Sequence, residues 1–176
     1  TGIGVLHGTA EALEMLPPYQ GGGEMIETVT KDRVTYARPP HRFEAGTPPI
    51  LEAIGLGAAL DWLMRFDRAA VAAHEKRLYD HARGRLVQVD GLRVLGEAPG
   101  KGAVLTFVLD GIHAHDLAQV MDRYGVAVRA GLHCCEPLAQ RFGVTSSTRA
   151  SFALYNTLED ADAFVDALVK AREFFV

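Results

Sequence analysis

The sequence predicts a protein of the α/β class, in which a compact α+β region follows a first third rich in glycine and proline. Short apolar runs typical of strands alternate with helix-like patterns beyond residue 67, and a change in composition near Arg65–Asp67 indicates a boundary. The 176 residues are 48% hydrophobic and 23% charged, which is ordinary for a soluble globular protein with its own core.

The first third predicts short elements separated by glycine and proline. Residues 1–6 have a strand-like pattern, and residues 10–16 form a helix that Pro17 stops. The run Gly21-Gly22-Gly23 predicts a loop able to approach a ligand or another chain closely. Two short strands are expected next, at 25–29 and 33–36.

A longer helix is predicted over residues 49–66. Thr47 is an N-cap residue, and the prolines after it are tolerated because the first turn of a helix needs no N–H there. Apolar residues recur at helical spacing, namely Ile50, Ile54, Ala58 and Trp62. Gly55 and Gly57 lower the helix propensity, so we expect close packing against a neighbour.

The remainder alternates between strands and helices. Strands are expected at 92–95, 104–109, 126–128 and 149–154, and helices at 67–88 and from 115 to Gly125. Thr157 and Asp160 predict the N-terminal cap of a final helix. The apolar face of that helix comprises Ala161, Phe164, Val165, Leu168 and Phe175.

Charge and cysteine content exclude several functions. The net charge of −4 gives no electrostatic reason to bind nucleic acid or an anionic membrane. No apolar run approaches the roughly 20 residues that span a bilayer, and no signal peptide is recognisable. The two cysteines are adjacent and cannot staple a scaffold, so we expect a reducing, cytoplasmic setting.

Residues 129–137, Arg-Ala-Gly-Leu-His-Cys-Cys-Glu-Pro, hold both cysteines and suggest a nucleophilic thiol. A strand that ends in arginine would deliver a thiol on a short loop, and positive charge nearby favours the reactive thiolate. The alternative is an ordinary pair of cysteines in a loop that adjoins an arginine.

Three further patterns carry weaker hypotheses. Arg149 opens an apolar strand and could pair with a carboxylate ligand, or equally with an acidic side chain of the protein. The segment 42–48 could bind an anion at a helix start, or Thr47 could simply cap that helix. A zinc site is disfavoured, because its candidate ligands have no supporting spacing. The residues considered for it are His113, His115, His133, Cys134 and Cys135.

Taken in order, five segments resemble the C-terminal part of a pyridoxal 5′-phosphate (PLP)-dependent cysteine desulfurase of the SufS (group II) type, in the class V aminotransferase superfamily. The segments are 1–6 (TGIGVL), 17–26 (PPYQGGGEMI), 42–48 (RFEAGTP), 124–134 (YGVAVRAGLHC) and 149–156 (RASFALYN). The resemblance implies a PLP-dependent transferase of fold type I. Residues 1–64 would end the large PLP-binding domain with its connecting helix, and residues 65–176 would form the C-terminal α+β small domain.

The resemblance also implies a role for four residues. Cys134 would be the nucleophile that takes sulfur from L-cysteine, leaving L-alanine and a persulfide for transfer to an acceptor protein and iron–sulfur cluster assembly. Arg149 would hold the substrate carboxylate, and Arg129 would lie beside the nucleophile. Thr47 would reach the cofactor phosphate of a partner subunit, so a homodimer is implied.

Three departures from the family pattern stand out. Leu132 replaces a common histidine, and Cys135 replaces a common alanine. The cofactor lysine of the family would lie upstream of Thr1, so we expect the chain alone to be inactive. The lysines present are not substitutes for it: Lys31, Lys76, Lys101 and Lys170.

Two alternatives remain open. A selenocysteine lyase or another class V aminotransferase-like enzyme would share the fold. A chain without catalysis could instead be a sulfur carrier or an inactive small-domain fragment.

Overall fold

The computed structural model of the chain describes residues 2–175. The chain divides into two compact units, Thr1–Arg65 and Phe66–Val176. The sequence placed a boundary at nearly the same point, between residues 64 and 65. The assignment of the first unit to a larger PLP-binding domain stays a prediction.

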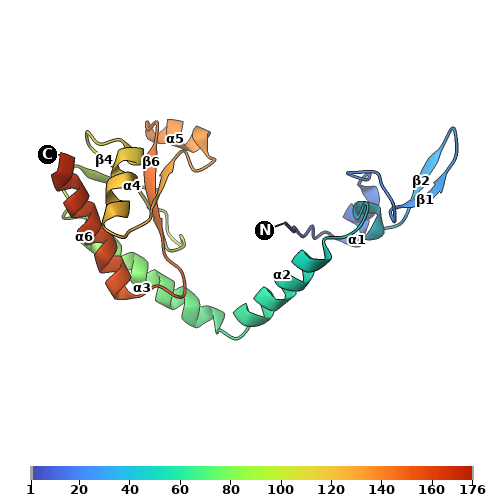
Figure 1. The fold of residues 1–176 in the computed structure, drawn as a ribbon, viewed down its shortest axis with the longest axis horizontal. Helices are drawn as coiled ribbons and strands as arrows, with labels where there is room; N and C mark the ends of the chain where they lie inside the picture. Colours follow the sequence, from blue (N-terminus) through green and yellow to red (C-terminus); the bar gives the residue numbers. More distant parts are fainter. Residues whose placement is uncertain (1, 176) are drawn as a thin grey trace. The chain divides into compact units, whose positions relative to one another are not determined.

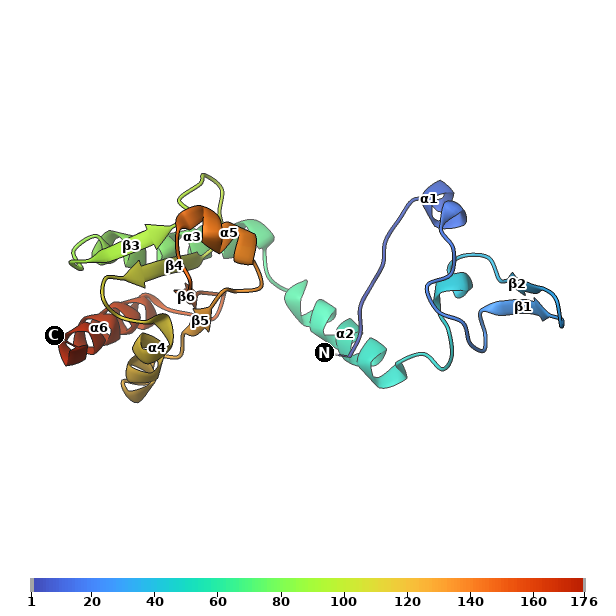
Figure 2. The ribbon, with the colours of Figure 1, turned by 90° about the horizontal axis from the view of Figure 1, so that it is seen from above.

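The first unit contains helical segments and one β-hairpin, which are α1 (Ala10–Met15), β1 (Ile26–Val29), β2 (Val34–Tyr36), the 3₁₀ turn η1 (His41–Phe43) and α2 (Ile50–Leu63). Strands β1 and β2 pair antiparallel (Figure 2). The short helix and both strands confirm the prediction for this region. Residues 2–6 form no strand, so that expectation is wrong for them, and residue 1 lies outside the described residues.

Helix α2 differs from its prediction in two ways. Pro49, and not Thr47, occupies the N-cap position, and no side chain caps this helix. The predicted apolar stripe is exposed, with 58% of Ile50 and 67% of Ile54 accessible to solvent. A Cβ added at Gly55 or Gly57 would meet nothing within 4 Å, so the expected close neighbour is not found among the described residues.

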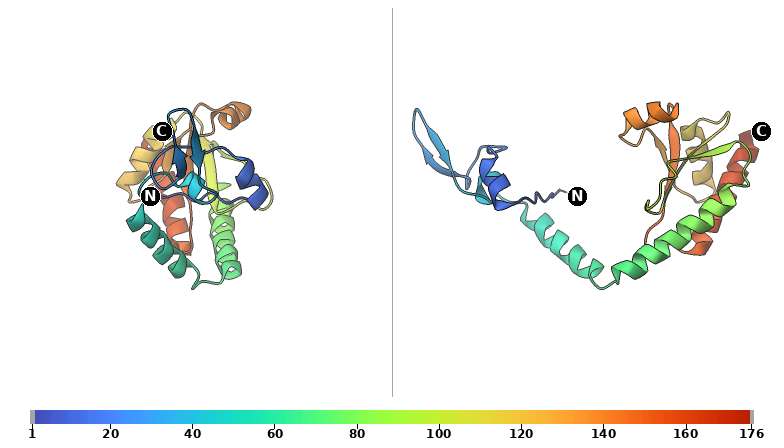
Figure 3. Two further views of the ribbon diagram at one scale, coloured as in Figure 1. Left: turned by 90° about the vertical axis from the view of Figure 1, so that its right-hand side faces the viewer. Right: turned by 180° about the vertical axis from the view of Figure 1, so that it is seen from behind.

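The second unit is built on an antiparallel sheet of order β3-β4-β6-β5 (Figure 2). Its strands are β3 (Leu92–Leu95), β4 (Val104–Leu109), β5 (Arg129–Gly131) and β6 (Ser147–Ser151). Its helices are α3 (Arg68–Leu86), α4 (Ala114–Arg123), α5 (Glu136–Phe142) and α6 (Leu158–Phe175). Helices α3 and α6 run side by side, as Figures 1 and 3 show.

One face of this sheet carries the core. Leu105, Phe107 and Leu109 alternate along β4 and are buried, as a strand with one covered face requires. They pack with buried side chains of α3, α4 and α6. Aromatic rings meet at the centre of this core. The ring centroid of Phe164 lies 5.9 Å from that of Phe107 and 6.0 Å from that of Phe152. The other face is free to carry polar side chains.

The two strands next to the cysteines lie elsewhere than predicted. The expected strand at 126–128 is not formed, and β5 begins only at Arg129. Val126 and Val128 are half-buried against the core instead, and the Val126 N–H donates to the Met121 carbonyl. Strand β6 starts two residues before Arg149, because Ser147 pairs with Gly131 of β5.

Local sequence patterns predict helix α6 but not helix α5. Thr157 and Asp160 exchange hydrogen bonds of 2.9 and 3.2 Å at the start of α6, which confirms the predicted cap. Ala161, Phe164, Val165 and Leu168 are buried as expected, but Phe175 is 40% exposed and does not belong to that face. Helix α5 was not predicted, although Pro137 near its start and Gly143 (φ 68°) at its end are typical boundary residues.

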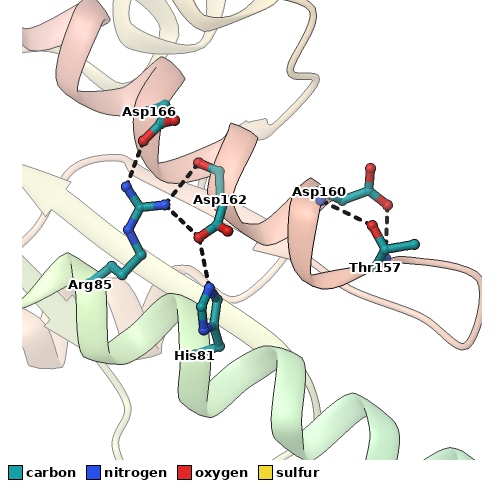
Figure 4. Close-up of polar contacts among 6 residues, drawn as sticks. All are labelled: His81, Arg85, Thr157, Asp160, Asp162 and Asp166. Carbon is teal, nitrogen blue, oxygen red and sulfur yellow. Dashed lines mark hydrogen bonds and ion pairs between the residues drawn. The ribbon is translucent and has the colours of Figure 1, made fainter.

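An ion cluster joins α3 to α6 on the surface of this unit (Figure 4). Asp162 accepts a hydrogen bond from His81 at 2.7 Å and from Arg85 at 2.6 Å, and Arg85 also donates to Asp166 at 2.6 Å. The hydrogen bonds from His81 and then Arg85 lower the pKa of the Asp162 carboxyl. All four groups are partly exposed, so water and salt weaken the cluster.

We expect Asp162→Asn to lower the thermal midpoint of unfolding at neutral pH. A carboxyl whose pKa is lowered on folding stabilises the protein above its ordinary pKa, near 3.9, and loses that effect as the pH falls through the lower folded value. The curves of midpoint against pH for wild type and variant should therefore converge in acid. Parallel curves would contradict the role given to this charge.

Candidate active site

Cys134 lies in a tight turn between β5 and α5. The Cys135 N–H donates to the Leu132 carbonyl at 3.1 Å, which closes a β-turn over residues 132–135. His133 and Cys134 occupy its central positions with φ values of 55° and 60°. Positive φ at both positions is typical of a type I′ turn and is unfavourable for residues other than glycine. This turn presents Cys134 to solvent, and such strain is commonly found at functional sites.

Two arginines lie opposite each other beside this turn. Arg129 of β5 pairs in register with Arg149 of β6, so their side chains share one face of the sheet. Neither has an acidic ion-pair partner among residues 2–175, and the buried Nε of Arg149 has no hydrogen-bond partner there. Like charges in direct opposition destabilise a sheet. The pair therefore fits a site for an anion that comes from outside this unit.

A cavity of about 320 Å³ opens on the same face of the sheet. Arg149 pairs with Thr106, and Thr106 pairs with Leu95, so one lateral row of the sheet forms part of its wall. The polar groups on the cavity wall include Arg149, Lys101, His133 and Ser147, and Cys135 also lines it. Most other lining residues are apolar. Such a cavity suits a small molecule that carries a carboxylate.

His133 connects the turn to strand β6. Its Nε2 lies 3.1 Å from both the carbonyl oxygen and the hydroxyl oxygen of Ser147. A carbonyl oxygen only accepts, so Nε2 carries the proton in this arrangement, and Nδ1 is a buried acceptor with no partner in the described residues. Burial first, and then the charge of Arg149, lower the pKa of His133, so its ring stays neutral at neutral pH.

We expect the stability of the second unit to fall as the pH drops below about 6.5, the ordinary pKa of histidine. The reason is that the unfolded chain takes up a proton at His133 that the folded chain resists. His133→Gln keeps an N–H donor for Ser147 but does not titrate. We would measure the free energy of unfolding by chemical denaturation between pH 5 and 8. It should change less steeply with pH in the variant than in the wild type, and an equal pH dependence would contradict this assignment.

Thr47, the fourth predicted site residue, lies in the first unit, and the structure does not place it against the other three. It is exposed and follows Gly46, whose φ is 81°. A Cβ at Gly22 would meet the Gly46 nitrogen at 3.3 Å, so the glycine loop packs against this segment. The Arg42 side chain donates to carbonyls of Ala37 and to Glu14, so Arg42 serves the fold of this unit.

Among the described residues, no group of three or more His, Cys, Asp or Glu side chains could hold a metal ion. His113 and His115 stack on each other with ring centres 5.5 Å apart at the start of α4. No described helix combines the length and the apolar character that crossing a bilayer requires.

The structure thus brings together Cys134, Arg129 and Arg149 around the β5–β6 pair, as the sequence motif suggested. It adds His133, Ser147 and Lys101, to which the sequence analysis assigned no role in this site. The alternation of Ser147, Arg149 and Ser151 along β6 was the available signal for its polar face. The contact between His133 and Ser147 had no signal, because it depends on how β5 and β6 pair.

An exposed thiol on a strained turn lies beside two arginines without acidic partners in the described residues, an arrangement that suits a cysteine nucleophile and a small anionic ligand. The chain belongs to the aminotransferase class-V family, whose sequence model matches residues 1–164. The predicted membership in this superfamily is therefore confirmed.

Named relatives support the same family. The chain is 51% identical to a probable cysteine desulfurase of Streptomyces coelicolor, over 99% of this chain and 42% of that protein. It is 46% identical to a cysteine desulfurase of Haloferax volcanii, over 99% of this chain and 41% of that protein. The chain thus spans about two fifths of the length of these relatives.

Solved structures agree in fold. The cysteine desulfurase CsdA of Escherichia coli matches with a TM-score of 0.94 and 40% identity, over 100% of this chain and 44% of that one. An apo cysteine desulfurase from Thermococcus onnurineus NA1 matches with a TM-score of 0.86 and 31% identity, over 93% of this chain and 41% of that one. These likenesses confirm the predicted α/β fold class.

Proposed function

We propose that this chain is part of a PLP-dependent cysteine desulfurase of the SufS (group II) type. The observation that carries the proposal is the exposed Cys134 on its turn beside the paired arginines. The reaction would be L-cysteine plus the Cys134 thiol giving L-alanine and a persulfide on Cys134. The sulfur would then pass to an acceptor protein for iron–sulfur cluster assembly.

Each of the three clustered residues has a distinct task in this proposal. Arg149 binds the substrate carboxylate, and its unpartnered guanidinium supports that role. Cys134 attacks the sulfur of the bound cysteine as a thiolate and keeps that sulfur as a persulfide. Arg129 adds a second positive charge on the sheet face that Arg149 shares, beside the turn that holds Cys134. Neutral His133 fixes the turn to β6 through Ser147.

The residues of this chain fit PLP only in part. Thr47 is exposed, and no side chain caps α2, so the Thr47 hydroxyl is available to a phosphate oxygen. When bound, the cofactor supplies the electron-withdrawing ring that exposes the substrate sulfur to attack. The lysine that holds the cofactor is not one of the four in this chain, under the proposal.

We propose a homodimer, in which Thr47 reaches the cofactor phosphate of the other subunit. The exposed apolar stripe of α2 supports burial against further protein, because large apolar surfaces seldom remain open to water. Adjacent cysteines without a structural disulfide support a reducing, cytoplasmic setting.

The test is the production of L-alanine from L-cysteine by the polypeptide that carries the cofactor lysine. One persulfide should form on the chain, with Cys134 as the thiol that first receives the sulfur, for each alanine released before any acceptor thiol is added. Selenocysteine added as a competing substrate distinguishes the desulfurase from a selenocysteine lyase, because the lyase would prefer selenocysteine to L-cysteine. Persulfide uptake from a donor, with no alanine formed, would point to a sulfur carrier and would reject the desulfurase.

A further inference from the structure

Cys135 differs from its neighbour in exposure and surroundings. Cys134 is exposed, whereas Cys135 is half-buried and lines the cavity of about 320 Å³. The Cys135 thiol donates a hydrogen bond to the Leu132 carbonyl at 3.2 Å, so its sulfur points back into the turn. Cys134 is not among the residues that line this cavity. The two adjacent sulfur atoms therefore face different environments.

The cavity suits a sulfur chain longer than a thiol. Its walls include apolar side chains of α5 and the loop that follows, such as Leu138, Phe142 and Val144. A persulfide adds one polarisable sulfur atom, which such walls accommodate well. Arg149 and Lys101 line the same space, and Arg149 has no acidic ion-pair partner in the described residues. A negative charge on a terminal sulfur would be stabilised there.

We propose that Cys135 is a second persulfide site, which takes the outer sulfur from a Cys134 persulfide and holds it in this cavity. The Cys135 sulfur attacks the outer sulfur, and the bond from that atom to the Cys134 sulfur breaks. Cys134 leaves as a thiolate and receives the proton that Cys135 gives up, so no oxidant or reductant is needed. The proposal rests on the desulfurase function for its natural source of sulfur.

The other reaction open to adjacent thiols is disfavoured by geometry. If Cys135 attacked the inner sulfur, hydrosulfide would leave and a disulfide would join neighbouring residues. Adjacent Cα atoms lie about 3.8 Å apart, which is shorter than the roughly 4.4–6.8 Å across an unstrained disulfide. Transfer of the outer sulfur creates no such ring in its product, and it leaves Cys134 as a free thiol.

The test loads sulfur chemically, with inorganic polysulfide added to the full chain. Samples taken over time are alkylated and cut with trypsin after Arg129 and Arg141, which leaves both cysteines in one peptide. Fragment masses then locate the extra sulfur. We expect it first on Cys134 and later mainly on Cys135. Removal by a small added thiol should be about ten-fold slower in wild type than in Cys135→Ser, because exposure controls thiol exchange.

Three results would overturn the proposal. The extra sulfur could stay on Cys134 throughout, or the wild type could lose two hydrogen atoms and release sulfide, which indicates the disulfide. Cys134→Ser could also load Cys135 as fast as the wild type does, which would remove the relay. Polysulfide loading needs neither cofactor nor L-cysteine. A failure of the desulfurase assay therefore leaves this measurement intact.

Discussion

Cys134→Ala in the complete enzyme should abolish persulfide formation and reduce alanine production by about 10³-fold or more. Removing a nucleophile eliminates the covalent step itself, and losses of this size or larger are typical for such residues. The substitution leaves the paired arginines untouched, and it removes only a side chain that is exposed. The cofactor should therefore remain bound, which its visible absorbance would report.

The neighbouring thiol provides the contrast for this result. Mass spectrometry of trapped persulfide should find no sulfur on the Cys134→Ala chain after incubation with L-cysteine. If Cys135→Ala removed persulfide formation while Cys134→Ala did not, the nucleophile would be Cys135. The half-buried position of Cys135 and its bond to Leu132 argue against that outcome.

Arg149→Ala should reduce kcat/KM for L-cysteine by about 30-fold to several thousand-fold. This range corresponds to the roughly 2–5 kcal/mol lost when one partner of a desolvated charge pair is removed. Arg149→Lys should recover only part of the loss, because an ammonium cannot hold a carboxylate with two parallel hydrogen bonds.

Arg149→Ala should not lower the stability of the fold. A loss of kcat/KM without a loss of stability would show that Arg149 acts in binding and not in folding. Removing Arg149 relieves its repulsion with Arg129 across the β5–β6 pair, an effect of about 0.2–1 kcal/mol. Arg141→Ala, at an exposed position of α5, is the matched control and should leave kcat/KM near the wild-type value. A large loss of thermal stability in Arg149→Ala would indicate a structural role instead.

Much of the fold could be predicted from local patterns, and the failures share one cause. Strand β4 and helix α6 were predicted well because their apolar periodicity and capping residues act locally. The run Val126–Val128 is equally apolar, yet it packs under α4 while β5 forms three residues later. The ladder between β5 and β6 is fixed by the pairing of Gly131 with Ser147, which apolar periodicity does not reveal.

The candidate site shows the same division. Cys134, Arg129 and Arg149 were found because they lie in recognisable motifs, although their roles stay predictions. The opposition of the two arginines depends on strand register, and the cavity depends on α5, which the sequence analysis missed. The hydrogen bond from His133 to Ser147 could not be predicted, because it depends on how β5 and β6 pair and nothing local indicates it.

The facing arginines have a consequence for how this protein should be handled and measured. The two arginines repel each other when no anion is bound. Any oxyanion that binds between them raises the free energy of unfolding, so the measured stability depends on which anions the solution contains. Sulfate or phosphate in a buffer would then act as a concealed ligand. Melting temperatures measured in such buffers would report occupancy of the site together with the strength of the fold.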